Sequence, residues 1–382
     1  MLNRLVDYMK NIILQILASL QAFFRKKTIL GSVCLVILVA CSPNNEELIL
    51  GEEVVYEVTN NVAYTEIEEL EEPIKTMNPL TGIYYEGEKN FFPVAVVINN
   101  IPAALPQSGI SEADIIYEVL AEGGITRLIA IFTNSEAEKI GPIRSTREYF
   151  ADIANNWNAP LVHHGGSPAG YDRIRQLGLT TLDGFYLENR YFWRRGGRPR
   201  EHSSYTNWDN ITTFLRENSP NHFNPENNSS WNNINFSNED TIRNSTKVEI
   251  NEVVITFSHA HQTKFVLQDD TFKRYQRGEV HIDEFTGEQV EVHNLLIKRA
   301  AHSPIPNDPE GRINVNVSGN GTGYLVTKDG YEEITWVSSE NGTIWLDLNG
   351  NDISLNRGNT WISIIGTNQN VELINNEHES EM

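Results

Sequence analysis

Residues 115–132 read IIYEVLAEGGITRLIAIF. Two apolar runs, 115–120 and 127–132, flank the dipeptide Gly123-Gly124. Short apolar runs that are rich in β-branched residues and bounded by turn residues are typical of buried strands. Because glycine accepts the positive φ angles of a tight turn, we expect these two strands to be joined as a hairpin.

On either side of this hairpin the sequence alternates between strands and helices. Apolar runs at 93–98 and 161–164 predict two further strands. Between them we expect a helix capped by Ser145 or Thr146, and a second helix follows from about 169 to 177. The apolar face of the first helix would consist of Tyr149, Phe150 and Ile153. Strands mixed with helices indicate an α/β or α+β first domain.

Beyond about residue 247 the sequence changes to strands punctuated by glycine turns. The clearest apolar runs are 253–257, 264–267, 295–298, 344–348 and 360–365. This rhythm is typical of a mainly antiparallel β domain. We expect Trp336, Trp345 and Trp361 to lie in its core or in cross-strand pairs. The glycine-rich run at 319–323 is expected to be a tight turn.

The N-terminus carries the features of a lipoprotein signal. A cationic cluster at 25–27 precedes an apolar run at 29–40, and small residues lead into Cys41. About a dozen apolar residues are too few to span a membrane but match a signal peptide. We expect Cys41 to be lipidated and to hold the body at the extracytoplasmic face of the cell membrane. The alternative is a short buried helix or an uncleaved anchor.

Composition divides the rest of the chain and excludes several kinds of partner. The segments we predict are signal peptide 1–40, lipidated acidic tether 41–77, N-terminal α/β domain 78–216, Asn-rich linker or surface excursion 217–246, C-terminal β domain 247–368 and polar tail 369–382. A formal net charge of -21 argues against nucleic acid as a partner. Both cysteines, Cys34 and Cys41, precede the body, which excludes disulfides and thiol catalysis from it.

Several long strings resemble one protein family. They include NPLTG at 78–82, EKIGPIRSTREYFADIA at 138–154, HHGGSPAGYDRI at 163–174, HIDEFTGE at 281–288 and GNTWISIIG at 358–366. These strings resemble the DUF3048 family of bacterial lipoproteins over roughly residues 78–366. The resemblance implies a palmitate-bearing envelope protein of Gram-positive bacteria, made of an N-terminal and a C-terminal part. It implies no established activity.

Charged residues concentrate between residues 114 and 147. Two arginines three residues apart at a helix start suit bidentate binding of phosphate or carboxylate. Alternate residues of a strand share a face, so two nearby carboxylates could point together. The candidate anion-binding pocket consists of Asp114, Glu118, Arg127, Arg144 and Arg147. The alternative is that these arginines form structural ion pairs with Asp114, Glu118 or Glu122.

A second candidate lies in the locally basic stretch around residues 163–202. This candidate ligand patch consists of His163, His164, Arg195, Arg198 and His202. It could receive an anionic glycan, a phosphate or an acidic partner, and Trp193 and Trp208 could stack on sugars. The alternative is that its arginines pair with the surrounding excess of carboxylates.

Metal and cofactor sites are not expected from the sequence. The histidines lack the short ligand spacing of a metal site, and no dinucleotide or phosphate-loop fingerprint is present. His259 and His261 stand in polar, turn-like sequence, where we expect them to be solvated.

Two hypotheses for function remain open. The first is a non-enzymatic envelope module that binds a cell-wall polymer or an envelope protein. The second is an enzyme acting on a phosphorylated or pyrophosphate-linked glycan. It rests on a strand-and-arginine pattern similar to that of the LytR-CpsA-Psr phosphotransferases, so it is an analogy of fold alone. The sequence favours the first hypothesis, because no complete catalytic constellation can be assembled from it.

Overall fold

The computed structural model describes residues 74–224, 234–237 and 248–375, which belong to one structural unit. Cys41, the expected signal peptide, nearly all of the tether and much of the 217–246 segment lie outside the described residues. Among the described helices, none has both the length and the apolar character needed to cross a membrane.

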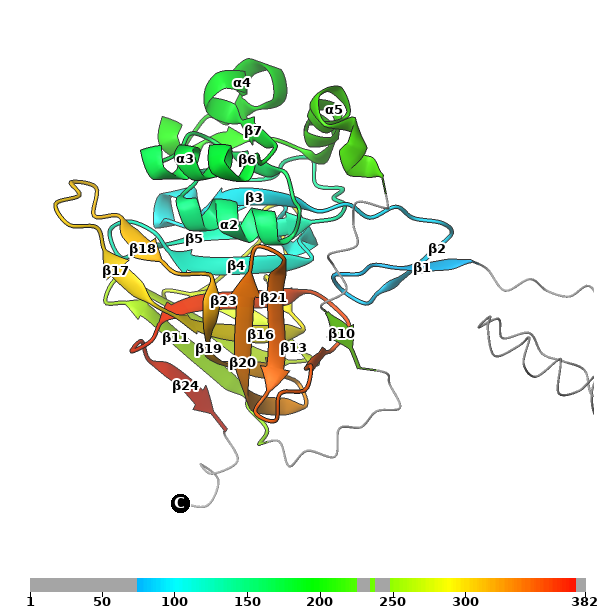
Figure 1. Cartoon of the computed structure of the whole chain (residues 1–382), viewed down its shortest axis with the longest axis vertical. Helices are drawn as coiled ribbons and strands as arrows, with labels where there is room; N and C mark the ends of the chain where they lie inside the picture. Colours follow the sequence, from blue (N-terminus) through cyan, green and yellow to red (C-terminus); the bar gives the residue numbers. More distant parts are fainter. Residues whose placement is uncertain (1–73, 225–233, 238–247, 376–382) are drawn as a thin grey trace, which may run out of the picture. The chain divides into compact units, whose positions relative to one another are not determined.

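A ten-stranded sheet runs through both halves of the sequence (Figure 1). Its strands, in spatial order, are β21 (Gly342–Asp347), β20 (Gly330–Ser339), β19 (Gly319–Thr327), β16 (Asn294–Ala300), β23 (Thr360–Gly366), β4 (Ile115–Leu120), β5 (Thr126–Phe132), β3 (Val94–Asn99), β6 (Leu161–His163) and β7 (Thr181–Asp183). The two halves meet where β23 pairs with β4 in parallel, with Trp361 opposite Ile116. The α/β and β parts of the chain therefore share this sheet.

A second sheet packs on one face of the first. Its strands are β14 (Glu279–Val280), β13 (Thr271–Gln276), β12 (His261–Gln268), β11 (Glu252–Ser258) and β24 (Val371–Ile374), with β15 (Glu291–Val292) beside β13. Ile116 and Leu128 of the first sheet share one core cluster with Val253 and Phe265 of the second. Over strands β3, β4 and β5, helices cover the opposite face of the first sheet.

The helices that cover this opposite face are α2 (Glu148–Asn156) and α3 (Pro168–Leu177), which contribute Phe150 and Ile174 to its core (Figure 1). Helices α4 (Gly184–Tyr191) and α5 (Trp208–Asn218) contribute to the other core cluster. Because both faces are covered, β3, β4 and β5 are buried along their whole length. This explains why their sequences are continuous apolar runs rather than alternating ones.

Shorter elements connect these layers. The short strand pairs are β1 (Lys75–Met77) with β2 (Tyr84–Glu86), β8 (Trp193–Arg194) with β9 (Ser204–Tyr205), β10 (Asn235–Phe236) with β22 (Ser354–Leu355), and β17 (His302–Pro304) with β18 (Ile313–Val315). The 3₁₀ turns are η1 (Pro102–Ala104), η2 (Ile110–Glu112), η3 (Arg200–His202) and η4 (Pro220–Phe223).

The predicted fold class is confirmed: the first part mixes helices and strands, and the second is mostly antiparallel. The hairpin at Gly123-Gly124 is present, with positive φ at both glycines, and the three tryptophans are buried as expected. Two local expectations are wrong. The 319–323 run begins strand β19, where a Cβ on Gly323 would lie 2.1 Å from the Ile297 carbonyl oxygen of the neighbouring strand.

The second local correction concerns the start of α2. Its N-cap is Arg147, not Ser145 or Thr146. Both hydroxyl residues are held by the loop after β6: the Ser145 hydroxyl donates to the carbonyl of His164 at 3.0 Å, and Thr146 bridges to Gly166. The expected apolar face of the helix, with Tyr149, Phe150 and Ile153, is buried.

One lysine lies in the core of the second half. Lys298, on β16, is 3% exposed. Its amine donates to the Val317 carbonyl at 2.8 Å and lies 3.9 Å from the ring centroid of Trp336. Burial lowers the pKa of Lys298 to about 7, because no water remains to solvate the charged form.

Candidate functional site

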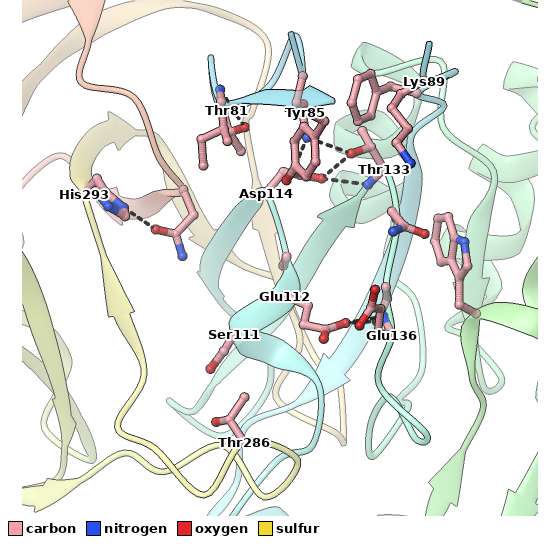
Figure 2. A pocket seen from close by; sticks show the side chains of 18 of the residues that line it. Thr81, Tyr85, Lys89, Ser111, Glu112, Asp114, Thr133, Glu136, Thr286 and His293 are labelled. Atoms are coloured by element: carbon pink, nitrogen blue, oxygen red, sulfur yellow. Dashed lines mark hydrogen bonds between the residues drawn. The ribbon is translucent and has the colours of Figure 1, made fainter. Parts of the chain in front are cut away.

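An open groove with a volume of about 780 Å³ lies at one end of the central strands (Figure 2). It is placed where β3, β4 and β23 begin and where β5 ends, since its lining includes Phe92, Asp114, Asn359 and Thr133. The second half lines it as well, with Thr286, Glu288, Gln289, Glu291 and His293. Both halves of the chain therefore build the groove.

Asp114 is a buried carboxylate in this groove. Its Oδ1 accepts a hydrogen bond from Asn78 Nδ2 at 2.8 Å, and its Oδ2 accepts from the backbone N–H and hydroxyl of Thr133 at 2.7 and 2.8 Å (Figure 2). Burial raises the pKa of Asp114 to about 6, although the hydrogen bonds from Thr133 and Asn78 oppose the rise. Asn78 opens the NPLTG string, so that string fixes this carboxylate.

Two further groups stand near Asp114. Burial and the charge of Asp114 raise the pKa of Tyr85, which lies beside Asp114 in Figure 2. Glu112 is tied down through one oxygen, which accepts from the backbone N–H groups of Glu136 and Ala137 at 2.6 and 3.0 Å. The polar groups of the groove are thus held in place before any ligand arrives.

Four aromatic side chains line the same groove. Tyr85 and Phe91 have ring centroids 5.6 Å apart, and Phe92 is stacked on Trp208, also at 5.6 Å and with an interplanar angle of 16°. Hydroxyl and amide groups complete the lining: Thr81, Asn90, Ser111, Asn134, Thr286, Gln289 and Asn359. Aromatic rings that offer apolar faces beside convergent hydrogen-bonding groups are typical of small-molecule sites.

The groove is acidic. Its lining carboxylates are Glu112, Asp114, Glu136, Glu288 and Glu291, whereas Lys89 is the cation among its lining residues and His293 the histidine. Such a surface repels phosphate and other anions, and it suits ligands rich in hydroxyl or amide groups. Among the residues that the structure describes, no group of three His, Cys, Asp or Glu could hold a metal ion.

The five residues of the expected anion-binding pocket do not line one pocket. Asp114 lies in the groove. Arg127 and Arg147 both bind Glu122, the second at 2.7 Å, and Arg127 also donates to the Ser145 carbonyl. Arg144 lines a different hollow, and Glu118 lies in the core. For Arg127 and Arg147 the geometry is that of structural ion pairs, the alternative left open by the sequence.

Glu118 is fully buried between the two sheets. Both of its oxygens lie 3.1 Å from Nη2 of Arg274 on β13, and His261 Nε2 is 2.8 Å from Oε1. Thr126 and Thr263 donate to the same carboxylate. Burial alone would raise the pKa of Glu118, but Arg274 and His261 outweigh this and hold it well below its ordinary range. The expectation that His261 is solvated is wrong, because Glu118 draws it into the core.

The structure brings together only Arg195 and Arg198 of the expected ligand patch. The buried His163 contacts the Gly165 carbonyl at 2.8 Å, and burial lowers its pKa. Arg195 and Arg198 both pair with Glu284, and Arg198 also donates to the carbonyls of Ala104 and Pro106. His202 contacts Asn99. His164 lines the same hollow as Arg144. Trp208 lines the groove rather than this patch.

Comparisons with known proteins identify the family of this chain. The model described as "Protein of unknown function (DUF3048) N-terminal domain" matches residues 80–221, and the corresponding C-terminal domain matches residues 251–362. The chain belongs to the DUF3048 family. Both matched segments of this DUF3048 protein contribute strands to the ten-stranded sheet and residues to the groove.

A relative and a solved structure agree with this assignment. YerB of Bacillus subtilis strain 168, which is classed as a lipoprotein, is 32% identical over 297 residues, covering 76% of this chain and 86% of YerB. The crystal structure of YerB from the same organism matches with a TM-score of 0.67 and 29% identity, covering 78% of this chain and all of that one.

The sequence did not single out most of the groove. Tyr85 lies on β2, Glu112 ends η2, and Phe91 and Phe92 precede β3, and these segments are brought together only by the sheet. The available signal was the NPLTG string, since its Asn78 binds Asp114 directly.

Proposed function

We propose that this DUF3048 protein is a lipid-anchored envelope module that binds an uncharged, hydroxyl-rich glycan in the groove. The observation that carries the proposal is the combination of four aromatic side chains with fixed carboxylates, amides and hydroxyls around one open space. Sugar rings present apolar faces to aromatic rings and hydroxyl groups to acceptors such as Asp114 and Glu112. The acidic lining disfavours phosphorylated glycans at this place.

Binding without phosphoryl transfer fits the charges better than the enzyme hypothesis. Phosphoryl transfer needs cations placed at the transferring group. Here Asp114 lies in the acidic groove, whereas Arg127 and Arg147 bind Glu122. The arrangement that the LytR-CpsA-Psr analogy requires is therefore absent from these residues.

The glycan proposal is tested by replacing Tyr85 with alanine. An aromatic contact is worth roughly 0.5–1.5 kcal/mol beyond its buried area, so we expect Kd for oligosaccharides of N-acetylglucosamine to rise by up to about tenfold. Isothermal titration calorimetry measures the change. The matched control is Tyr84→Ala, because Tyr84 is the neighbouring exposed tyrosine of β2 and does not line the groove. Equal binding by Tyr85→Ala and the unchanged protein would refute the proposal.

Membrane anchoring through Cys41 is the second part of the proposal. It is supported by the signal-like residues 25–41 and by similarity to a relative classed as a lipoprotein. Cys41→Ala removes the thiol that would carry lipid, so we expect the protein to leave the membrane fraction, since this lipid is the attachment that we propose. Cys34→Ala, which alters the other cysteine within the apolar run, should leave fractionation unchanged. Retention of the Cys41→Ala protein in membranes would contradict lipid anchoring at this residue.

A further inference from the structure

A second hollow, of about 500 Å³, lies at the carboxyl end of β6 and shares no lining residue with the groove. Strands β3, β6 and β7 run parallel there. Crevices at the carboxyl ends of parallel strands are where open α/β sheets bind ligands. The loop after β6 contributes Gly165 and Gly166 to the lining, and the Asp183 side chain accepts from the Gly165 backbone N–H at 2.8 Å.

The hollow is cationic within an acidic protein. Three arginines line it, Arg144, Arg194 and Arg200, against one acidic lining residue, Glu201. Glu188 binds both Arg194 and Arg200, at 2.9 and 3.1 Å, so one carboxylate serves two arginines. Arg144 forms no ion pair with any carboxylate of the described residues, and its Nη1 donates only to the Glu201 carbonyl, at 3.0 Å.

Among the three arginines of the hollow, Arg144 is the one whose charge a bound anion would stabilise most. Burial lowers the pKa of Arg144, and the charges of Arg147 and Arg194 add to this, whereas the charges of Glu122 and Glu201 oppose it. A guanidinium presents five N–H donors in a plane, of which this one uses one in the protein. A phosphate or carboxylate would fit the remaining donors.

His164 positions a second guanidinium. Its Nε2 lies 2.7 Å from Nη2 of Arg194, which can only donate, so the histidine accepts there and its Nδ1 faces the Ser204 hydroxyl at 3.0 Å. Burial and the charge of Arg194 lower the pKa of His164 to about 4, which keeps the ring neutral near pH 7. The neutral ring holds Arg194 without competing with it for an anion.

Two aromatic side chains border the same hollow and face solvent. Phe185 is 64% and Tyr186 is 73% exposed, and their rings meet edge to face at 5.1 Å. They follow the N-cap residue Asp183 at the start of α4. Exposed aromatic rings beside fixed cations are suited to a ligand that carries both a ring and a negative charge.

We propose that this hollow is a second binding site, which takes an anionic sugar. The phosphate or carboxylate of the ligand binds Arg144 and Arg200, and its sugar ring packs on Phe185 and Tyr186. The site is independent of the groove, which selects uncharged ligands. The protein therefore holds two sites of opposite charge preference.

Calorimetric titration of the full-length protein in detergent tests this site with four probes: glucose 1-phosphate, glucuronate, inorganic phosphate and glucose. We expect the anionic sugars to bind, glucose to fail, and the affinity to fall with added salt. Comparing glucose 1-phosphate with glucuronate identifies whether phosphate or carboxylate is preferred. Binding of glucose as tight as that of glucose 1-phosphate would overturn the proposal.

Variants assign the binding to named residues. Arg144→Gln and Arg200→Gln should each weaken glucose 1-phosphate at least tenfold, and Arg200, whose side chain is 75% exposed, can be replaced without disturbing the core. Phe185→Ala should weaken the sugar phosphate but not inorganic phosphate. Arg175→Gln is the control, since this exposed arginine of α3 pairs with Asp172 away from the hollow. Tyr85→Ala, which tests the groove, should leave this binding intact. Unchanged binding in both arginine variants would refute the site.

Discussion

Arg274→Met is expected to lower the free energy of unfolding by about 3–5 kcal/mol, because it leaves the Glu118 carboxylate buried without its cation. Methionine keeps much of the side-chain volume. The loss therefore reports the charge and the hydrogen bonds to Gln276 and His281, together with the contact to the Trp361 ring at 4.4 Å. Urea denaturation at pH 7 measures it.

Two companion variants make this result interpretable. Lys273 precedes Arg274 on β13 and forms a partly exposed ion pair with Glu291. Lys273→Met should therefore lower the free energy of unfolding by less than about 1 kcal/mol. Glu118→Leu combined with Arg274→Met removes both charges and should recover a large part of the loss. If Arg274→Met proves no more harmful than Lys273→Met, the ion pair contributes nothing to stability.

The ion pair between Glu118 and Arg274 also makes the stability of the fold depend on pH. The pKa of Glu118 is held below its ordinary value of 4.5. The contribution of this carboxylate to the free energy of unfolding is therefore fully present above pH 4.5 and is lost as the pH falls further. Without Arg274 the pKa of Glu118 rises. Acid unfolding of Arg274→Met should therefore begin at a higher pH than that of the unchanged protein.

Lys298→Met is expected to stabilise the protein, by about 2–3 kcal/mol at pH 6. The pKa of Lys298 falls from 10.5 to about 7 on folding. Below pH 7 the amine is charged in both states, so the cost of burying it, roughly 5 kcal/mol for this shift, is present in full. The substitution leaves the Val317 carbonyl without its hydrogen-bond donor, which reduces the increase in the free energy of unfolding.

The gain from Lys298→Met should shrink as the pH rises from 7 towards 10.5, where the unfolded lysine also loses its charge. Thermal or urea unfolding at pH 6 and pH 9 measures both ends of this window. The control is Lys264→Met, since Lys264 pairs with Glu252 and is partly exposed, and its effect should be small at either pH. A loss of stability at pH 6 would show that the buried lysine stabilises the fold.

Local sequence patterns predicted the strands well but not their partners. The run at 360–365 indicated a buried strand, and it is β23. Nothing in its residues indicates that β4 lies beside it, because an apolar run predicts a strand but does not identify the strand that pairs with it. The same limit applied to Glu118: nearby arginines seemed its natural partners, whereas Arg274 comes from a distant strand.

The candidate sites were predictable where the interacting residues lie in one region of the sequence. Arg127, Arg147 and Glu122 are close in sequence, and the ion-pair alternative describes them. Asp114 and His164 were named in advance, and each lines an open space. Trp208 was named for stacking on sugars, but Tyr85, Phe91 and Phe92 of the groove were not, because segments from both halves meet there only after the sheets have formed.

The position of β23 also governs when the molecule can finish folding. One edge of β4 has no strand partner until residues 360–366, among the last of the described chain, pair with it. Pairings between such distant residues slow folding, and an uncovered apolar edge favours association with other chains. The first half of the described chain therefore cannot complete the central sheet without residues 360–366 of the second half.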